Sequence, residues 1–204
     1  MHPVIVLYAT REGHTKRVAQ YIVKASRSLS PLITVLDVNN LPDGLCLTAY
    51  AGVIIAASVH GGKHEPEIVN FVRNHRTDLN RMRTAFLSVS LSQAGAQDEH
   101  ASPDSRARAT ADVKRMIDVF LAATQWHPML IQPVAGALMY SRYNFLVRFI
   151  MKRIALRASA SSDTSRDHVF TRWHELDDLL PRLLSEKTLS VNLGPQSTGS
   201  GQVP

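Results

Sequence analysis

The sequence predicts an α/β fold in which a five-stranded parallel sheet is covered by helices on both faces. Two observations predict this fold: short apolar runs alternate with longer amphipathic segments, and the first run passes through a Thr/Gly loop into a helix. Strands that alternate with helices form right-handed crossover units, which build parallel sheets with both faces covered. The 204 residues include 45% hydrophobic and 20% charged residues, as is typical of one globular domain with ample core.

The candidate strands are short runs rich in Val, Ile and Leu. Such runs are typical of strands that are buried on both faces of a parallel sheet. They cover residues 3–8, 32–36, 52–57, 85–89 and 129–135. The turn-rich segment Asn39–Gly44 separates the second run from the third.

The candidate helices follow the first, third and fourth runs, and one more closes the domain. The first begins near Lys16, while Pro66 and Pro103 suit the first turns of the second and third. The last begins near Trp173, and Pro181 predicts a kink or a late stop in it. The later helices have apolar residues at helical spacing: Ile68, Val69, Phe71 and Val72; Ala109, Val113, Met116, Ile117, Phe120 and Leu121; and Leu176, Leu179, Leu180 and Leu183.

The loop after the first strand has the residues of a phosphate site. Backbone N–H groups at a helix N-terminus are unpaired, and the helix dipole favours an anion there. Thr10 and Thr15 add hydroxyl donors, and Gly13 allows close approach of the backbone. The loop lacks the Walker A ending and the G-x-G-x-x-G fingerprint. The alternative interpretation is an ordinary helix N-cap at Thr10 or Thr15.

Two further strand ends carry loops that meet the first one. Ligands of parallel sheets bind at the carboxyl ends of the strands, near the topological switch point. The third strand leads into 57–64 and the fourth into 88–93, and both loops have polar groups and small residues. The alternative for Gly61-Gly62 is a plain turn, and for His60 and His64 it is exposure in a loop. Two loop histidines without a third ligand do not indicate a metal site.

The strand, loop and helix together resemble the FMN-phosphate loop of the flavodoxin family. The resemblance rests on the order T-x-x-G-x-T after an apolar strand that ends in Leu-Tyr. Over residues 3–185 the chain also resembles the menaquinone-dependent protoporphyrinogen oxidases of bacterial haem synthesis, which are flavodoxin-like FMN proteins. The stretches that carry this second resemblance are Ala57–Val59, Ser88–Leu91, Thr124–Pro128, Val134–Tyr143, Arg148–Lys152 and Asp163–Asp167.

The resemblance implies a flavodoxin-like three-layer sandwich with FMN as cofactor. The cofactor-binding residues that it implies are Thr10, Arg11, Glu12, Gly13, His14, Thr15, Ser58, Val59, His60, Gly61, Gly62, Ser88, Val89, Ser90, Leu91 and Ser92. The chain departs from flavodoxins in one respect, because neither 60–64 nor 88–93 contains an aromatic residue. The stacking partner of the flavin must then come from elsewhere. The sequence identifies no catalytic side chain.

A basic helical insertion is predicted at 136–168, after the fifth strand. No Asp or Glu occurs between Asp118 and Asp163, and aromatic and leucine residues are interleaved with Arg and Lys there. This pattern is typical of a helix that lies in a membrane interface with anionic headgroups. The alternative is a helix packed on its own domain. Nucleic-acid binding is not indicated, since no helix-turn-helix, zinc or RNP pattern is present.

The implied reaction is oxidation of protoporphyrinogen IX to protoporphyrin IX, with menaquinone or ubiquinone as acceptor. The substrate propionates are anionic, and the cations expected to pair with them are Arg142, Arg148, Lys152 and Arg153. One alternative is a flavodoxin-type electron carrier that docks to redox partners. Such a carrier is expected to be acidic when its partners are basic, whereas this chain is basic. Another alternative is a binding module of the same fold without flavin.

Composition indicates where the protein works. The net charge is +6, which indicates an anionic partner. The single cysteine, Cys46, excludes an internal disulfide, and no signal peptide or membrane span is seen. We therefore expect a cytoplasmic protein, peripheral on the cytoplasmic face of the inner membrane, and the sequence leaves homo-oligomer formation open. Residues 1–185 are expected to form the domain, and 186–204 a disordered tail.

Overall fold

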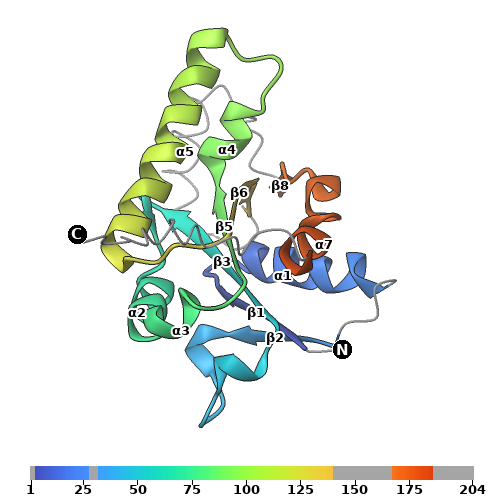
Figure 1. Cartoon of the computed structure of the whole chain (residues 1–204). Coiled ribbons are helices and arrows are strands. Elements are labelled where there is room, and N and C mark those ends of the chain that lie inside the picture. Colours follow the sequence, from blue (N-terminus) through green and yellow to red (C-terminus); the bar gives the residue numbers. More distant parts are fainter. Residues whose placement is uncertain (1–2, 28–31, 140–166, 186–204) are drawn as a thin grey trace, which may run out of the picture.

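A parallel sheet with the strand order β2-β1-β3-β5-β6 forms the centre of the molecule (Figure 1). The computed structural model describes residues 3–27, 32–139 and 167–185. The strands of the path are β1 (Val4–Ala9), β2 (Ile33–Asp37), β3 (Gly52–His60), β5 (Thr84–Ser90) and β6 (Leu130–Ala135). All four pairings along the path are parallel. The predicted sheet of five parallel strands is confirmed.

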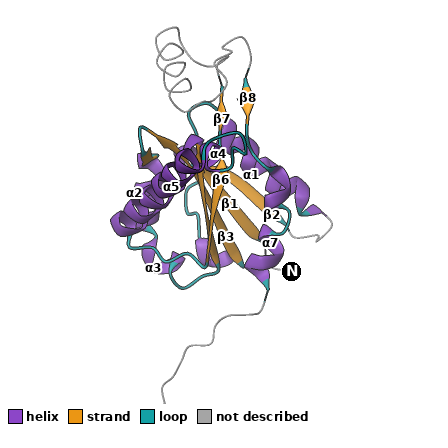
Figure 2. Ribbon diagram, turned by 90° about the horizontal axis from the view of Figure 1, so that it is seen from above, coloured by secondary structure: helices purple, strands orange, loops and turns teal. Residues whose placement is uncertain are grey.

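Helices cover both faces of this sheet, so the molecule has three layers (Figure 2). On one face lie α2 (Pro66–Asn74), α3 (Arg76–Leu79) and α5 (Pro103–Thr124), and on the other α1 (His14–Ala25) and α7 (Leu179–Leu184). Single-turn 3-10 helices lie at Val38–Asn40, Leu47–Ala49 and Trp173–Leu176. The predicted three-layer sandwich is confirmed.

The alternation of side chains along each strand divides the core in two. In β1, Ile5 and Leu7 belong to the cluster that packs against α2 and α5, whereas Val4 and Val6 belong to the cluster that packs against α1 and α7. Each of these residues is fully buried. A sheet buried on both faces favours strands that are apolar at most positions, which is why the strands could be recognised in the sequence.

Aromatic packing anchors α5 to the sheet. The rings of Phe86 in β5 and Phe120 in α5 stack with centroids 4.4 Å apart, and Trp126 meets Phe86 edge-on at 5.6 Å. Trp126 is 1% exposed, and its indole N–H donates to the Thr84 hydroxyl at 3.3 Å. These contacts fix the C-terminal end of α5 against the first half of β5.

The third strand is longer than predicted and folds back on itself. It continues to His60, turns at Gly61-Gly62 and pairs antiparallel with β4 (Lys63–His64). The φ angles of Gly61 and Gly62 are 58° and 79°. Positive φ at both central positions is typical of one of the favoured two-residue hairpin turns, and glycine adopts it without steric cost. The interpretation of Gly61-Gly62 as a turn is therefore confirmed, and a loop over all of 57–64 is wrong.

The fourth predicted strand leads directly into a helix, so the loop expected at 88–93 is wrong. Ser88, Val89 and Ser90 are the last residues of β5, and α4 (Leu91–Ala96) begins immediately after them. The Ser90 hydroxyl accepts a hydrogen bond from the Gln93 N–H at 3.2 Å and caps α4. A six-residue helix of this composition is too short to give a periodic signal.

The C-terminal segment forms two short helices where one was predicted. A 3-10 turn at Trp173–Leu176 precedes α7, and Pro181 lies in the first turn of α7. Proline is tolerated there because the N–H groups of a first turn have no partner in the helix. The prediction of a kink or stop at Pro181 is wrong. The apolar spacing is confirmed, since Leu179 and Leu183 are fully buried.

A small ribbon stands at the carboxyl edge of the sheet. It pairs β7 (Ala137–Leu138) antiparallel with β8 (His168–Val169). The predicted insertion lies mostly at 140–166, outside the described residues, as do Arg142, Arg148, Lys152, Arg153 and the tail 186–204. In the described part of the chain, no helix is long and apolar enough to cross a membrane.

Candidate functional site

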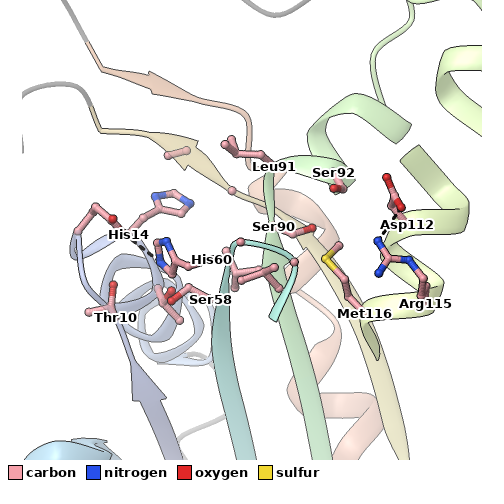
Figure 3. Close-up of a pocket in the computed structure, with 18 residues that line it drawn as sticks. Thr10, His14, Ser58, His60, Ser90, Leu91, Ser92, Asp112, Arg115 and Met116 are labelled. Atoms are coloured by element: carbon pink, nitrogen blue, oxygen red, sulfur yellow. Dashed lines mark hydrogen bonds and ion pairs between the residues drawn. The ribbon is translucent and has the colours of Figure 1, made fainter. Parts of the chain in front are cut away.

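A cavity of about 370 Å³ opens at the carboxyl ends of the strands (Figure 3). It lies at the switch point, where the chain leaves β1 toward β2 on one side and β3 lies on the other. Its size falls within the range of small-molecule sites. The described residues that line it are Thr10, Glu12, His14, Thr15, Ser58, Val59, His60, Gly61, Gly62, Val89, Ser90, Leu91, Ser92, Asp112, Arg115, Met116, Gly136 and Ala137.

The loop between β1 and α1 forms the first wall. The Thr10 hydroxyl accepts a hydrogen bond from the Gly13 N–H at 2.9 Å, which closes the loop on itself. Gly13 adopts the left-handed region with φ 88° and is followed by the first residue of α1. The N–H groups of the first turn of α1 therefore meet the cavity without partners within the helix. This is the arrangement that attracts anions.

Two buried polar atoms in the first turn of α1 have no hydrogen-bond partner among the described residues. They are the Thr15 hydroxyl and His14 Nδ1, and these residues are 1% and 5% exposed. His14 Nε2 lies 2.8 Å from the Thr171 hydroxyl, which itself donates to the Ala135 carbonyl at 2.6 Å. Buried polar atoms are ordinarily satisfied. Two unsatisfied atoms beside a helix N-terminus fit a polar ligand at this point.

His14 is neutral because it is buried. Burial, followed by the nearby Arg17 charge, lowers the pKa of His14 to about 4. The Thr171 hydroxyl donates its hydrogen to Ala135, so Nε2 carries the hydrogen toward Thr171. Nδ1 is then a bare acceptor, which suits a hydroxyl or N–H group of a ligand.

The second wall is the hairpin after β3, and charged groups hold it to the first wall. Nε2 of His60 lies 3.1 Å from Glu65 Oε1 and 3.3 Å from Glu12 Oε2. Both contacts are at ion-pair distance but lack hydrogen-bond alignment. Glu65 also accepts from Arg11 Nε at 3.0 Å and from the Ser58 hydroxyl at 3.1 Å. Figure 3 shows the His60 ring pointing toward the β1–α1 loop.

These contacts shift two pKa values in opposite directions. The carboxylate of Glu12, and after it that of Glu65, raises the pKa of His60 to about 9. Burial alone would raise the pKa of Glu65, but His60, Arg11 and Ser58 outweigh it and the pKa lies below its ordinary value. At neutral pH His60 and Glu65 are therefore both ionised.

The third wall comes from α4, α5 and the segment after β6. Asp112 and Arg115 of α5 form an ion pair at 2.9 Å, and Met116 lies one position further along the chain. Gly136 closes the floor, where a Cβ would meet the Ser90 backbone carbon at 3.2 Å. The aliphatic surfaces of Val59, Leu91 and Met116 give the cavity an apolar part beside its polar end.

Comparison with known proteins agrees with this geometry. A family model described as Flavodoxin domain matches residues 5–165. The chain belongs to the flavodoxin domain family. The Escherichia coli (strain K12) protein named Protoporphyrinogen IX dehydrogenase (quinone) is 31% identical over 172 residues, 84% of this chain and 89% of that protein. The Leishmania major protein of the same name is 32% identical over 172 residues, 83% of this chain and 69% of that protein.

Among solved structures, oxidised Flavodoxin 1 from Bacillus cereus has a TM-score of 0.43 and 19% identity, covering 66% of this chain and 84% of that one. The Fusobacterium nucleatum flavodoxin bound to flavin mononucleotide has a TM-score of 0.37 and 12% identity, covering 64% and 69%. The predicted resemblance is confirmed by the family match and by the names of the curated relatives.

The flavodoxin domain brings most of the predicted site residues together, but not all of them. Arg11, Gly13 and Ser88 do not line the cavity. Arg11 has a 59% exposed side chain and acts through Glu65, while Gly13 shapes the loop. Ser88 is fully buried, and its hydroxyl lies 2.9 Å from His64 Nε2. Ser88 therefore packs in the core of the flavodoxin domain.

Several residues around the cavity were not predicted. Asp112, Arg115 and Met116 lie on a long surface helix whose sequence gives no sign that it reaches a site. The place of Glu65 at the start of a helix could be inferred from the sequence, because Glu65 directly precedes Pro66. Its burial could be found only from the structure.

The expectation of exposed loop histidines is wrong for His64. It is 6% exposed and packs between the rings of Phe86 and Phe120, with centroids 5.2 and 4.9 Å away. Burial lowers its pKa to about 4, so His64 is a neutral core residue of the flavodoxin domain. The described residues contain no cluster of three or more His, Cys, Asp or Glu side chains that could hold a metal.

Proposed function

We propose that this chain is an FMN-dependent oxidoreductase that oxidises protoporphyrinogen IX to protoporphyrin IX and passes the electrons to a membrane quinone. The observation that carries the proposal is the unpartnered Thr15 hydroxyl at the N-terminus of α1, at the switch point of a flavodoxin domain. The names of the relatives from Escherichia coli and Leishmania major support the substrate and the acceptor.

The residues of the cavity fit FMN. The phosphate would be held by the loop from Thr10 to Thr15, which offers backbone N–H groups, two hydroxyls and the helix dipole. The ring would lie between the segments 58–62 and 89–92, which line the far end of the cavity. Of the described lining residues, none is Phe, Tyr or Trp, so the ring would meet aliphatic side chains and His60.

The bound cofactor would supply the redox chemistry, and the chain's own residues would bind, orient and exclude water. Thr10, Thr15 and the first turn of α1 would anchor the phosphate end. Gly61 and Gly62 would let the backbone approach the ring closely, because a Cβ added at either position would have no atom within 4 Å. Substrate and cofactor would thus meet in one fixed orientation.

The substrate's propionates need cations. Arg142, Arg148, Lys152 and Arg153 are proposed for this role, since they belong to the acid-free stretch after Asp118 and Arg suits bidentate contact with carboxylates. The same stretch is proposed to contact anionic lipid, where the quinone is dissolved. We therefore propose a cytoplasmic protein that works at the membrane surface, with its domain at 1–185 and a dispensable tail at 186–204.

Anaerobic turnover tests the proposal. The protein is loaded with FMN and given protoporphyrinogen IX with either a menaquinone or a ubiquinone analogue. Porphyrin fluorescence that needs both enzyme and quinone is the expected result, and the faster acceptor identifies the quinone class. Bound FMN with electron transfer only in the presence of a reductase would instead support a flavodoxin-type carrier. A protein that takes up no flavin would overturn both.

A further inference from the structure

Glu65 is an ionised carboxylate in a place where water hardly reaches. Its side chain is 2% exposed and meets three groups: His60 Nε2 at 3.1 Å, Arg11 Nε at 3.0 Å and the Ser58 hydroxyl at 3.1 Å. Burying a charge is strongly unfavourable unless other groups compensate it. The compensation here comes from outside α2, from residues on two other segments.

The group joins the three segments that meet at the switch point. Arg11 and Glu12 belong to the β1–α1 loop, His60 ends β3, and Glu65 directly precedes α2. Of these residues, His60 is the one that contacts both carboxylates, Glu12 at 3.3 Å and Glu65 at 3.1 Å. His60 thus connects the β1–α1 loop, which forms the first wall of the cavity, to the hairpin, which forms the second wall.

The two strands of the hairpin are held differently: His64 of β4 is buried between Phe86 and Phe120, whereas His60 of β3 faces the two carboxylates. Gly61 and Gly62 have no atom within 4 Å of the points where Cβ atoms would lie, and both residues line the cavity. The position of the turn is therefore set by its stems. One stem ends at His60, directly before Gly61.

We propose that His60 is a positioning residue of the cofactor pocket. As a cation between Glu12 and Glu65, it holds the Gly61-Gly62 turn against the β1–α1 loop and so fixes the width of the pocket for the ring of a flavin. The inference rests on the proposed function for the identity of the ligand. It assigns His60 a role in cofactor affinity and no role in the chemistry.

The charge of His60 decides whether the link holds. The charged groups that face it are Glu12 and Arg11 on the loop, Glu65 before α2 and Lys63 opposite it in the hairpin. The two carboxylates lie nearest, and they keep the imidazole charged at neutral pH. The imidazole loses its positive charge as the pH rises through about 9, so the contacts of His60 with Glu12 and Glu65 should weaken in the alkaline range.

FMN affinity across pH tests the proposal. Quenching of FMN fluorescence gives the Kd for the wild type, His60→Gln and His60→Arg, from neutral pH to above 9. We expect His60→Gln to bind about tenfold more weakly at neutral pH, the size of one lost ionic contact. The wild type should lose affinity above about pH 9, whereas His60→Arg, which stays charged, should restore affinity and show no loss. Ionisation of FMN itself affects every variant alike, so the profiles are compared as ratios.

Two further variants sharpen the test. Glu12→Gln removes the larger cause of the raised pKa of His60, so it should move the alkaline loss of affinity to lower pH. A residue that only fills space would not shift this profile. His127→Gln is the matched control, because His127 is exposed and lies just before β6, at the amino ends of the strands. It should bind as the wild type does.

The outcomes separate the two proposals. Equal Kd values for the wild type and His60→Gln at neutral pH, or an alkaline loss that persists in His60→Arg, would overturn the role of His60 alone. A wild type that binds no FMN would overturn both this role and the proposed function. Should His60→Gln fail to fold by circular dichroism, the profile shift in Glu12→Gln decides.

Discussion

Nε2 of His14 lies 2.8 Å from the hydroxyl of Thr171, so the first turn of α1 is hydrogen-bonded to a residue 157 positions later in the chain. Thr171 in turn donates to the Ala135 carbonyl at 2.6 Å, at the end of β6. The three residues connect the start of α1, the end of the edge strand β6 and the segment after β8. They also fix the tautomer of His14, which leaves Nδ1 without a hydrogen.

Replacing Thr171 by Val should destabilise the protein. The change keeps the shape but leaves both the His14 N–H and the Ala135 carbonyl unpaired in a buried place, at a cost of about 1–3 kcal/mol. Urea unfolding gives the difference. Thr110→Val is the control, because its hydroxyl bonds to Arg106 on the exposed side of α5. An equal loss of unfolding free energy in both variants would show that the hydrogen bonds of Thr171 stabilise the protein no more than the exposed one of Thr110.

Replacing Thr15 by Val should weaken FMN binding and leave the fold intact. The Thr15 hydroxyl is buried and has no hydrogen-bond partner in the described part of the chain, so its removal breaks no hydrogen bond there. A hydrogen bond to a charged phosphate contributes about 1.5–3 kcal/mol, or about 10- to 100-fold in Kd. Riboflavin lacks the phosphate and should bind both proteins alike. Equal weakening for FMN and riboflavin would contradict a phosphate contact at Thr15.

The free energy of unfolding should fall in mild acid because of two buried histidines. The pKa values of His14 and His64 are about 4 in the folded state, against 6.5 for an unperturbed histidine. Between these values the unfolded chain binds more protons, so stability decreases as the pH falls from 6.5 to about 4. The slope is about 1.4 kcal/mol per pH unit for each histidine.

Urea midpoints across this range measure that slope, and a His64→Leu variant should lose about half of it. His75→Gln is the comparison, because His75 is only partly buried, with its ring against Phe71. A slope that does not depend on His64 would contradict the assignment.

Replacing Gly136 by Ala should disturb the floor of the cavity. The added Cβ would lie 3.2 Å from the Ser90 carbonyl carbon and 3.3 Å from its oxygen, and a strand backbone cannot move aside cheaply. We expect a loss of about 1–3 kcal/mol in unfolding free energy and weaker FMN binding. Gly95→Ala is the matched control: the added Cβ on α4 would make an ordinary 3.5 Å contact with Ala109 of α5 and should stabilise by about 0.5–1 kcal/mol. Thermal unfolding of both variants gives the comparison.

The sequence predicted the framework because the framework is repetitive. Strands that are apolar at most positions and helices with one apolar side give signals over about six or more residues, and the sheet has the predicted strands. The hairpin at Lys63–His64 and the helix Leu91–Ala96 are too short for such signals. The prediction of a kink or stop at Pro181 was wrong for a different reason. The effect of a proline depends on where the helix starts, and the spacing of the leucines does not define that start.

The site was predictable to the extent that it follows the strand ends. Thr10, Thr15 and Gly61 lie where a parallel sheet places its ligands, so position along the chain was enough to name them. Glu65 contacts Arg11, 54 positions earlier, and Thr171 contacts His14, 157 positions earlier, and such pairings leave no pattern in the sequence. Binding of FMN by these residues stays a prediction.

The ribbon of β7 and β8 has a consequence for how the chain is assembled. Leu138 pairs with His168, so two residues far apart in the sequence lie one strand spacing apart, about 4.8 Å. Of the described strands, none that follows Ala135 belongs to the central sheet. The order of the sheet is therefore complete before the ribbon begins, and a short turn that joined Leu138 to His168 would leave every pairing of the central sheet unchanged.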